Sequence, residues 1–205
     1  MKTFFILFIL GFSKFCFCQK DKTFPETKGH TLTEKATTIP FNNKKFSVIA
    51  IAYHRDAETD LKKWIQPMYN LFIKKEKTEG TIDVTELYDV NFVFVPLISG
   101  FKKHADEFKR GIDKELWPYI LDTEKTDIKA LEKTLEVKDT KIPYFYVLDK
   151  TGKIVDVESG KYEEAKLDKI DDAIDWRLII NINSLVNSNC ICLLKALQPS
   201  KAIKE

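Results

Sequence analysis

The sequence predicts an α/β protein in which a central mixed β-sheet carries helices on both of its faces. Two short apolar runs rich in β-branched residues, at 46–53 and 90–98, have the composition of buried central strands. A third region, residues 142–155, contains two more strand-like runs around a polar turn. Stretches with apolar residues at helical spacing lie between and after these runs, an alternation that favours a strand–helix–strand half followed by a hairpin and a helix.

The clearest single element is the β-hairpin predicted at 142–155. Two runs rich in aromatic and β-branched residues flank a turn at 149–153, which contains the glycine that such turns favour. Pro143 stands at the first position of the leading strand, where a missing backbone N–H costs least. Because it follows the apolar Ile142, Pro143 is also a candidate for a cis peptide bond.

The chain before the first buried strand, residues 19–45, forms a polar lead-in that is broken by two prolines and a glycine. A short strand or hairpin is expected there, around Leu32 and Ile39. No composition shift inside this segment indicates a separate domain. With 205 residues, the chain is long enough for one domain with a full apolar core.

A first helix is predicted directly after the strand at 46–53. Asp56 is a candidate cap for its N-terminus. Pro67 lies inside the helical pattern, and it is expected to bend the helix because an interior proline removes one hydrogen bond. The apolar residues that define the helical spacing are Ala57, Leu61, Trp64, Ile65, Met68, Leu71 and Phe72.

Further elements are predicted between the strand at 90–98 and the hairpin. A helix follows this strand, and residues 116–121 are expected to form a short edge strand because Pro118 suits an edge. Asp122 and Thr123 are candidate caps for a third helix. The apolar stripes of these two helices and of a final one after the hairpin are Phe101, Ala105, Phe108 and Ile112; Ile128, Leu131 and Leu135; and Leu167, Ile170, Ile174 and Leu178.

The hairpin, with its apolar-Pro start and the run Asp-Lys-Thr-Gly-Lys-Ile-Val at 149–155, resembles the C-terminal hairpin of thioredoxin-like proteins of the TlpA-like and peroxiredoxin-like branch. The order of elements over about 39–179 is similar to that family, including the kinking proline of the first helix at Pro67. The resemblance implies a thioredoxin-like domain at 46–179 and a separate tail at 180–205. It also implies that Pro143 is cis and faces the place of the redox site.

The cysteines that thioredoxin chemistry needs are missing at that place. Such proteins carry Cys-x-x-Cys at the start of the first helix, where the helix dipole stabilises a nucleophilic thiolate. Counting back from Pro67, as in the family, puts the two cysteine positions at Thr59 and Lys62, so the motif is replaced by Thr59-Asp60-Leu61-Lys62. A peroxiredoxin cysteine is missing too, because all four cysteines of the chain lie outside residues 19–189.

The first eighteen residues have the pattern of a signal peptide. A positive start is followed by an apolar run at 4–12, and Cys16 and Cys18 put small side chains at positions −3 and −1 of a cut before Gln19. The run is too short to span a bilayer. We therefore expect export to an extracytoplasmic compartment, periplasmic or secreted. The alternative interpretation is an uncleaved anchor or a buried N-terminal helix, and membrane association is expected only through such an uncleaved N-terminus.

Charge and metal-ligand patterns argue against several other functions. The 33 basic and 31 acidic residues nearly cancel, so a nucleic-acid partner is not expected. The three histidines and the cysteines show no metal-binding spacing, so neither a metal nor another cofactor is expected. His54, at the strand-to-helix turn, suggests a base or a ligand, but a polar loop residue is the simpler interpretation.

Two functions remain. The first is a non-catalytic binding or assembly module, similar in kind to cysteine-poor thioredoxin-fold assembly factors of respiratory complexes. It would hold an extended polypeptide or an envelope protein in the groove beside the proline, by β-augmentation. The residues expected around this groove are Tyr53, His54, Arg55, Thr59, Lys62, Ile142 and Pro143, with Tyr144 and Tyr146 beside them.

The second function is that of a thiol-disulfide oxidoreductase or redoxin-like protein that uses Cys190 and Cys192, folded back toward the groove. Two thiols separated by one residue can form a strained, easily reduced disulfide or bind a soft metal such as Cu(I). The other interpretation of this pair is two small apolar residues in a tail helix.

Overall fold

The computed structural model describes residues 19–74, 90–97 and 102–174. The predicted signal peptide, residues 75–89 and 98–101, and the tail with Cys190 and Cys192 lie outside these ranges. Within them, no helix is both long enough and apolar enough to cross a membrane.

The centre of the fold is a four-stranded mixed sheet in the order β4-β3-β6-β7. Its strands are β3 (Phe46–Ile51), β4 (Val90–Val95), β6 (Tyr144–Leu148) and β7 (Ile154–Ser159). β4 runs parallel to β3, whereas β6 is antiparallel to both β3 and β7. The two apolar runs and the hairpin that the sequence indicated are therefore the four strands of this sheet.

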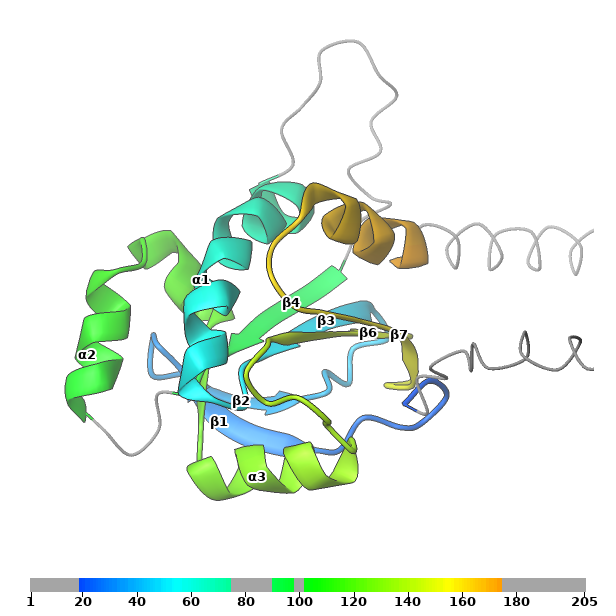
Figure 1. The fold of residues 1–205 in the computed structure, drawn as a ribbon, viewed down its shortest axis with the longest axis horizontal. Coiled ribbons are helices and arrows are strands. Elements are labelled where there is room, and N and C mark those ends of the chain that lie inside the picture. The colour runs from blue at the N-terminus through cyan, green and yellow to red at the C-terminus, as the bar shows by residue number, and fades with distance from the viewer. Residues whose placement is uncertain (1–18, 75–89, 98–101, 175–205) are drawn as a thin grey trace, which may run out of the picture.

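Both faces of the sheet are buried, as the near-continuous apolar runs predict. α1 (Arg55–Tyr69) and the helix at residues 164–174 lie on one face, and α3 (Lys125–Thr134) lies on the other (Figure 1). Alternate residues of each strand serve opposite faces: Val48 and Ala50 join the first side's core, and Ile49 and Ile51 join the second.

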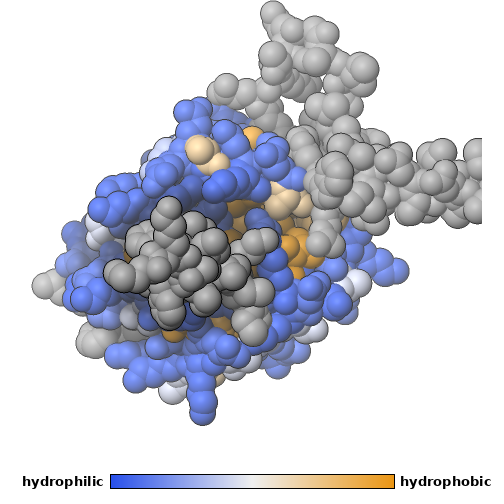
Figure 2. Space-filling model, turned by 45° about the vertical axis from the view of Figure 1, so that its right-hand side comes forward, coloured by the Kyte–Doolittle hydropathy of each residue, from blue (hydrophilic) through white to orange (hydrophobic). Residues whose placement is uncertain are grey.

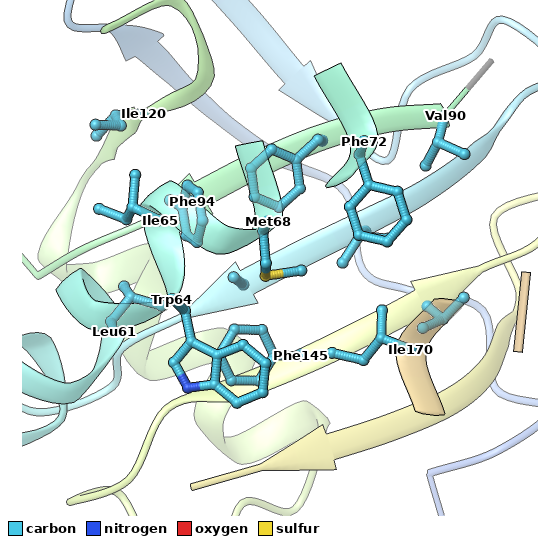
Figure 3. Close-up of a cluster of buried hydrophobic side chains, with 14 of the residues drawn as sticks. Leu61, Trp64, Ile65, Met68, Phe72, Val90, Phe94, Ile120, Phe145 and Ile170 are labelled. Carbon is cyan, nitrogen blue, oxygen red and sulfur yellow. The ribbon is translucent and has the colours of Figure 1, made fainter. Parts of the chain in front are cut away.

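The first face holds the core around α1. Trp64 and Met68 are fully buried, and the ring of Trp64 lies 4.2 Å from that of Phe145 on β6, measured between centroids (Figure 3). Pro67 lies inside α1, as predicted, and a π-helical turn at Asn70–Lys74 follows it. The apolar stripe of the sequence thus packs directly on the sheet.

The hairpin of β6 and β7 is confirmed, with its turn at 149–153. One carboxylate oxygen of Asp149 accepts hydrogen bonds from the backbone amides of Thr151 and Lys153, at 2.8 and 3.1 Å. Gly152 has a φ of +82°, in the left-handed region that favours glycine. The glycine expected in this turn and the carboxylate of Asp149 thus close the hairpin.

The lead-in is part of the packed domain rather than an arm. β1 (Thr27–Thr31) pairs with β2 (Ala36–Ile39) to form the expected hairpin, and Phe24 and Ile39 join the core.

Seen from another side, the surface is mainly hydrophilic, with hydrophobic residues visible near its centre (Figure 2). This agrees with the high proportion of charged residues, 31%.

Residues 116–121 do not form the predicted edge strand. Lys114–Tyr119 form a 3-10 helix, and the strand, β5 (Leu121–Thr123), starts later and pairs with β1 in a second sheet, β2-β1-β5. Pro118 accounts for part of this difference, since its fixed φ suits a helical turn as well as an edge. The sequence pattern identified a strand here but misplaced its start.

The two predicted caps are also displaced. His54, not Asp56, caps α1, and Glu124 rather than Asp122 or Thr123 precedes α3. The first helix nevertheless starts where it was expected, within one residue of Asp56.

The cis peptide bond expected before Pro143 is wrong. Among the described residues, the cis bond is that between Ile39 and Pro40. The carbonyl of Pro143 accepts a hydrogen bond from the amide of Gly160 at 2.9 Å, so the chain at Pro143 is held by the loop after β7. The sequence favoured a cis bond on the basis of the neighbouring residue type, which does not determine the isomer by itself.

Candidate functional site

A pocket of about 680 Å³ opens where β3 ends, between the start of α1 and the helices α2 (Lys102–Arg110) and α3. All five site residues predicted near the start of the first helix line it, whereas Ile142 and Pro143 do not. The lining residues are Tyr53, His54, Arg55, Glu58, Thr59, Lys62, Leu97, Glu107, Phe108, Lys125, Ile128, Lys129, Glu132 and Thr140.

His54 positions the first turn of α1. Its Nδ1 accepts a hydrogen bond from the amide of Asp56 at 3.1 Å, and its carbonyl accepts one from Ala57 at 3.1 Å. These contacts satisfy amides that a helix start leaves without partners. His54 is therefore a capping residue, close to the polar loop residue of the simpler interpretation.

α1 starts about one turn before Thr59 and Lys62, the positions that the resemblance predicts for the redox cysteines. α1 begins at Arg55, so Thr59 is its fifth residue and Lys62 its eighth. The amides left free by a helix start are confined to its first four or so positions. A thiolate is stabilised most at the N-terminal end of a helix, which carries a partial positive charge. Thr59 and Lys62 lack sulfur, and they also lie beyond this first turn of α1.

Lys62 contacts the floor of the pocket. Its Nζ lies 4.5 Å from the centre of the Phe108 ring, within the range of a cation–π contact, and Phe108 is almost fully buried. The Lys62 side chain therefore extends across the pocket and contacts α2.

The pocket combines an apolar floor with a charged rim. Tyr53, Phe108 and Ile128 form the floor and are buried. The rim carries both signs: Arg55, Lys62, Lys125 and Lys129 are basic, and Glu58, Glu107 and Glu132 are acidic. Such a site can hold an apolar side chain while the rim contacts polar groups around it. Nothing in this lining is an activated nucleophile, and no group of three potential metal ligands occurs in the described part of the chain.

Beneath the pocket, Tyr53 belongs to a buried cluster of tyrosines. Its hydroxyl lies 3.0 Å from that of Tyr146, and its ring meets Tyr144 edge-on at 5.9 Å. Burial raises the pKa of Tyr53 well above its ordinary value of 10, and the neighbouring Tyr146 raises that pKa further. Burial also raises the pKa of Tyr146. Tyr144 and Tyr146 thus support Tyr53 from within the core instead of lining the pocket.

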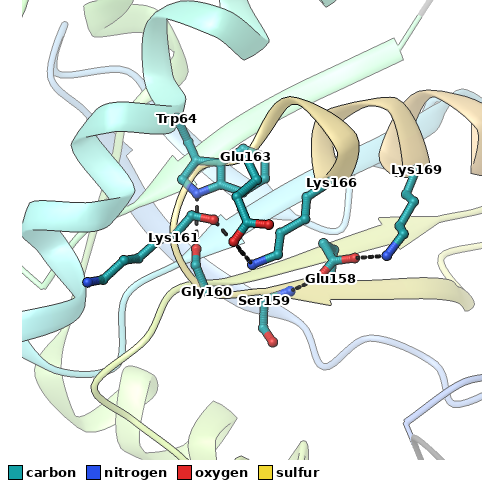
Figure 4. Close-up of polar contacts among 8 residues, drawn as sticks. All are labelled: Trp64, Glu158, Ser159, Gly160, Lys161, Glu163, Lys166 and Lys169. Atoms are coloured by element: carbon teal, nitrogen blue, oxygen red, sulfur yellow. Dashed lines mark hydrogen bonds and ion pairs between the residues drawn. The ribbon is translucent and has the colours of Figure 1, made fainter.

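The proline-bearing segment is engaged by the fold itself. The amide of Gly160 donates to the carbonyl of Pro143, and the carbonyl of Gly160 accepts from the Trp64 indole at 3.1 Å. Figure 4 shows this loop joined to the following helix, where Lys166 contacts both the carbonyl of Lys161 and the carboxylate of Glu163. The Pro143 carbonyl therefore already has a protein partner where the family resemblance suggested a site for an added strand.

Nine of the fourteen residues that line the pocket were not named as site residues from the sequence. Phe108 and Ile128 were predicted as core residues of two helical stripes, and the charged residues of α2 and α3 were not singled out. No sequence signal shows that these helices converge on the start of α1. Cys190 and Cys192 lie outside the described residues, so the structure does not relate them to this pocket.

The comparisons with known proteins agree on the fold. The thioredoxin domain of a thiol-disulfide oxidoreductase from Bacteroides vulgatus superposes with a TM-score of 0.55 at 13% identity, over 76% of this chain and 97% of that chain. A Chlorobium tepidum structure described as a thiol:disulfide interchange protein DsbE gives a TM-score of 0.53 at 14% identity, over 76% and 96%. At these identities the likeness shows the fold alone. No curated protein sequence matches the chain.

The model of the ATP10 protein family matches residues 13–174. This range includes every strand of both sheets and all three labelled α-helices. The mixed sheet with helices on both faces is the thioredoxin-like fold that the hairpin indicated. The protein therefore belongs to the ATP10 protein family, and its domain is thioredoxin-like.

Proposed function

We propose that this chain is an exported, non-catalytic binding or assembly module that uses the pocket at the start of α1 to hold a polypeptide partner. The observation that carries the proposal is a pocket that is lined by predicted site residues but contains no cysteine. Five predicted residues still line the pocket, but the cysteine positions are Thr59 and Lys62, neither of which can form a disulfide.

The form of the pocket supports a polypeptide ligand. The buried floor of Tyr53, Phe108 and Ile128 offers space for one apolar side chain. The mixed charges of the rim suit a ligand that carries polar main-chain groups and both signs of charge, and a single-sign ligand such as nucleic acid would meet the acidic residues. Because Ile142 and Pro143 do not line this pocket, we assign recognition to the side chains of the pocket rather than to strand addition at Pro143.

The class of partner follows from the family and from the predicted export. The chain belongs to the ATP10 protein family and resembles thioredoxin-fold assembly factors of respiratory complexes, so a subunit of a membrane-bound complex is the first class of partner to test. A cleaved signal peptide would place the module on the outer side of the inner membrane or beyond it, where such subunits expose loops and termini. A cysteine-free domain is also compatible with an oxidising compartment, since it has no thiol to be oxidised.

Site-specific photo-crosslinking tests this proposal. A photoreactive residue is placed at Thr59, in the pocket, and in a matched variant at Thr151, in the hairpin turn at the other end of β6. After irradiation in an envelope extract, we expect the Thr59 probe to capture polypeptides that the Thr151 probe does not.

The capture should depend on the rim of the pocket. Combining the Thr59 probe with Arg55→Ala should reduce capture several-fold, whereas combining it with Lys63→Ala should leave it unchanged, because Lys63 is exposed on the same helix but does not line the pocket. Equal capture by the two probes, or capture insensitive to Arg55, would contradict the assigned site.

The alternative function, a thiol-disulfide oxidoreductase that uses Cys190 and Cys192, is separated from this one by an activity assay. The binding module is expected to show no reduction of insulin by dithiothreitol above the background rate. Catalysed reduction that disappears in Cys190→Ser would establish the oxidoreductase and defeat the non-catalytic proposal.

A further inference from the structure

A second pocket, of about 550 Å³, is formed by the sheet β2-β1-β5 and the start of α3. It shares no lining residue with the pocket at the start of α1. Its lining contains four carboxylates and one lysine, namely Glu34, Asp122, Glu124, Asp127 and Lys28. The second pocket is therefore acidic, whereas the first pocket carries both signs of charge.

The excess of negative charge remains when the ion pairs around the second pocket are counted. The ammonium of Lys28 lies 3.6 Å from the carboxylate of Glu26, and that of Lys109 lies 3.5 Å from the carboxylate of Glu34. Within the described residues, the other three carboxylates of the lining form no ion pair with a lysine or an arginine. The pocket thus has unpaired negative charge available for a cationic ligand.

Two polar atoms of this lining are buried without a hydrogen-bond partner among the described residues. They are Oδ1 of Asp122 and Oγ1 of Thr123, and Thr123 is only 1% exposed. Both residues directly precede α3, but neither caps it, because the cap position is Glu124. Buried polar atoms in folded proteins nearly always have a partner. Helix capping therefore does not account for these two side chains, and a ligand can supply the missing hydrogen bonds.

We propose that the second pocket binds an arginine side chain of a polypeptide partner. A guanidinium presents several N–H donors in one plane, and it stays charged at any physiological pH. It can donate to a carboxylate and to a hydroxyl oxygen at the same time, which are the acceptors that Asp122 and Thr123 provide. A metal ion is less suitable, because no group of three potential metal ligands occurs in the described part of the chain.

The electrostatics of Asp122 agree with a cationic ligand. Burial raises the pKa of this carboxyl above its usual value, and the neighbouring Glu124 raises it further. Lys109 and His30, which stands opposite Asp122 in the pairing of β1 with β5, lower that pKa. The cost of the Asp122 charge is thus offset only in part by the protein. A bound guanidinium would offset more of it.

The start of α3 contributes to both pockets. Lys125 and Ile128 line the first pocket, and Glu124 and Asp127 line the second. Asp127 also lies in the first turn of α3, where an acidic side chain complements the helix dipole, so we assign the main contact to Asp122 and Thr123. A polypeptide held at the first pocket can bring an arginine to the second, and this choice of ligand rests on the proposed function.

Titration of the isotope-labelled full chain, followed by nuclear magnetic resonance, tests the arginine site. The titration is carried out at about pH 7.5, to keep histidine side chains largely uncharged. The probe is N-acetyl-arginine amide, and the matched control is N-acetyl-citrulline amide, which has nearly the same shape but no charge. We expect saturable shifts of the Asp122 and Thr123 amides with the arginine probe only. Equal shifts with both probes, or shifts with neither, would overturn the inference. Shifts with calcium chloride but not with arginine would assign a metal site and would overturn it too.

Two variants locate the contact. Asp122→Asn should weaken arginine binding by about tenfold, and Thr123→Val, which removes the hydroxyl at nearly constant shape, by about threefold. Asp168→Asn is the control, because Asp168 is exposed and does not line the pocket, and it should leave the affinity unchanged. The same spectra report whether each variant is folded. Wild-type affinity in both folded pocket variants would contradict the assigned contact.

Photo-crosslinking tests the polypeptide source of the arginine. A photoreactive residue at Thr38, an exposed residue of the second pocket, should capture the polypeptide that the Thr59 probe captures, and an excess of N-acetyl-arginine amide should reduce this capture. Arginine binding without any capture at Thr38 would point to a free small molecule and would overturn the polypeptide assignment. Capture by the Thr59 probe does not depend on these results, so the proposed function can hold when this inference fails.

Discussion

The core side of α1 and its pocket end differ in what they retain of the thioredoxin-like pattern. On the core side, Trp64 and Met68 are fully buried, and Trp64 contacts Phe145 and the Gly160 loop. At the pocket end, Thr59 and Lys62 are exposed side chains at the two positions for which the resemblance predicts cysteines. The apolar pattern of the core side is intact, whereas neither of these two pocket residues carries sulfur.

This difference separates the residues of α1 that stabilise the fold from those that line the pocket. Burial of the apolar stripe stabilises α1 on the sheet whatever the exposed positions carry. Exposed substitutions away from packed contacts usually change stability little, so the cysteine positions can diverge while the fold persists. Substitutions on the two sides should therefore have effects of different size and kind.

The largest effect is expected for Trp64→Ala on the core side. Removal of this buried indole should lower the free energy of unfolding by about 3–5 kcal/mol, because it leaves a cavity against Phe145 and frees the Gly160 carbonyl. Urea unfolding followed by circular dichroism measures this. The exposed neighbour Lys63→Ala is the control, and a loss below about 1 kcal/mol in Trp64→Ala would contradict the anchoring role.

A smaller loss is expected for Tyr146→Phe, which strands the buried hydroxyl of Tyr53. An unpaired buried hydroxyl costs about 1–3 kcal/mol, whereas replacing both partners can be nearly neutral. The double variant, Tyr53→Phe with Tyr146→Phe, should therefore lose less stability than the sum of the two single variants. Additive losses in urea unfolding would show that the two hydroxyls do not depend on each other.

The same pair predicts an alkaline sensitivity. The pKa values of Tyr53 and Tyr146 are raised in the folded protein, so the folded state keeps their protons while the unfolded state releases them near pH 10. Their contribution is complete below pH 10 and is lost as the pH rises above it, by up to about 1.4 kcal/mol per pH unit for each group. Urea unfolding at several pH values should show a shallower decline in the double phenylalanine variant than in the wild type.

Removal of the helix cap should cost less again. His54→Ala deletes the acceptor for the Asp56 amide and is expected to cost about 1 kcal/mol. His30→Ala, an exposed change on β1, is the control and should have little effect. Equal unfolding free energies for the two variants would mean that the cap contributes nothing measurable.

The smallest loss of stability is expected at the second cysteine position. Lys62→Ala removes one cation–π contact with Phe108, for which we expect about 0.5–1 kcal/mol or less. Its effect should instead appear in partner capture by the Thr59 probe. If Lys62→Ala lowers the free energy of unfolding more than His54→Ala does, Lys62 stabilises the fold. That result would contradict the proposed difference between the two sides of α1.

The sequence alone determined the elements whose residues interact locally or carry a strong burial pattern. The hairpin was predictable because its turn is closed by its own residues, Asp149 and Gly152. The buried strands and the stripe of α1 were predictable because apolar side chains must recur with the period of the element that buries them. The absence of sulfur at Thr59 and Lys62 was equally plain.

The tertiary structure alone decided the features that depend on residues far apart in the chain. The isomer at Pro143 and the pairing of β5 with β1 each depend on neighbours that no local pattern identifies. The pocket is the clearest case, since α2 and α3 supply six of its fourteen lining residues. A local sequence pattern predicts the secondary structure and the burial of a residue. The packing of helices that are distant in the chain determines which residues line one pocket.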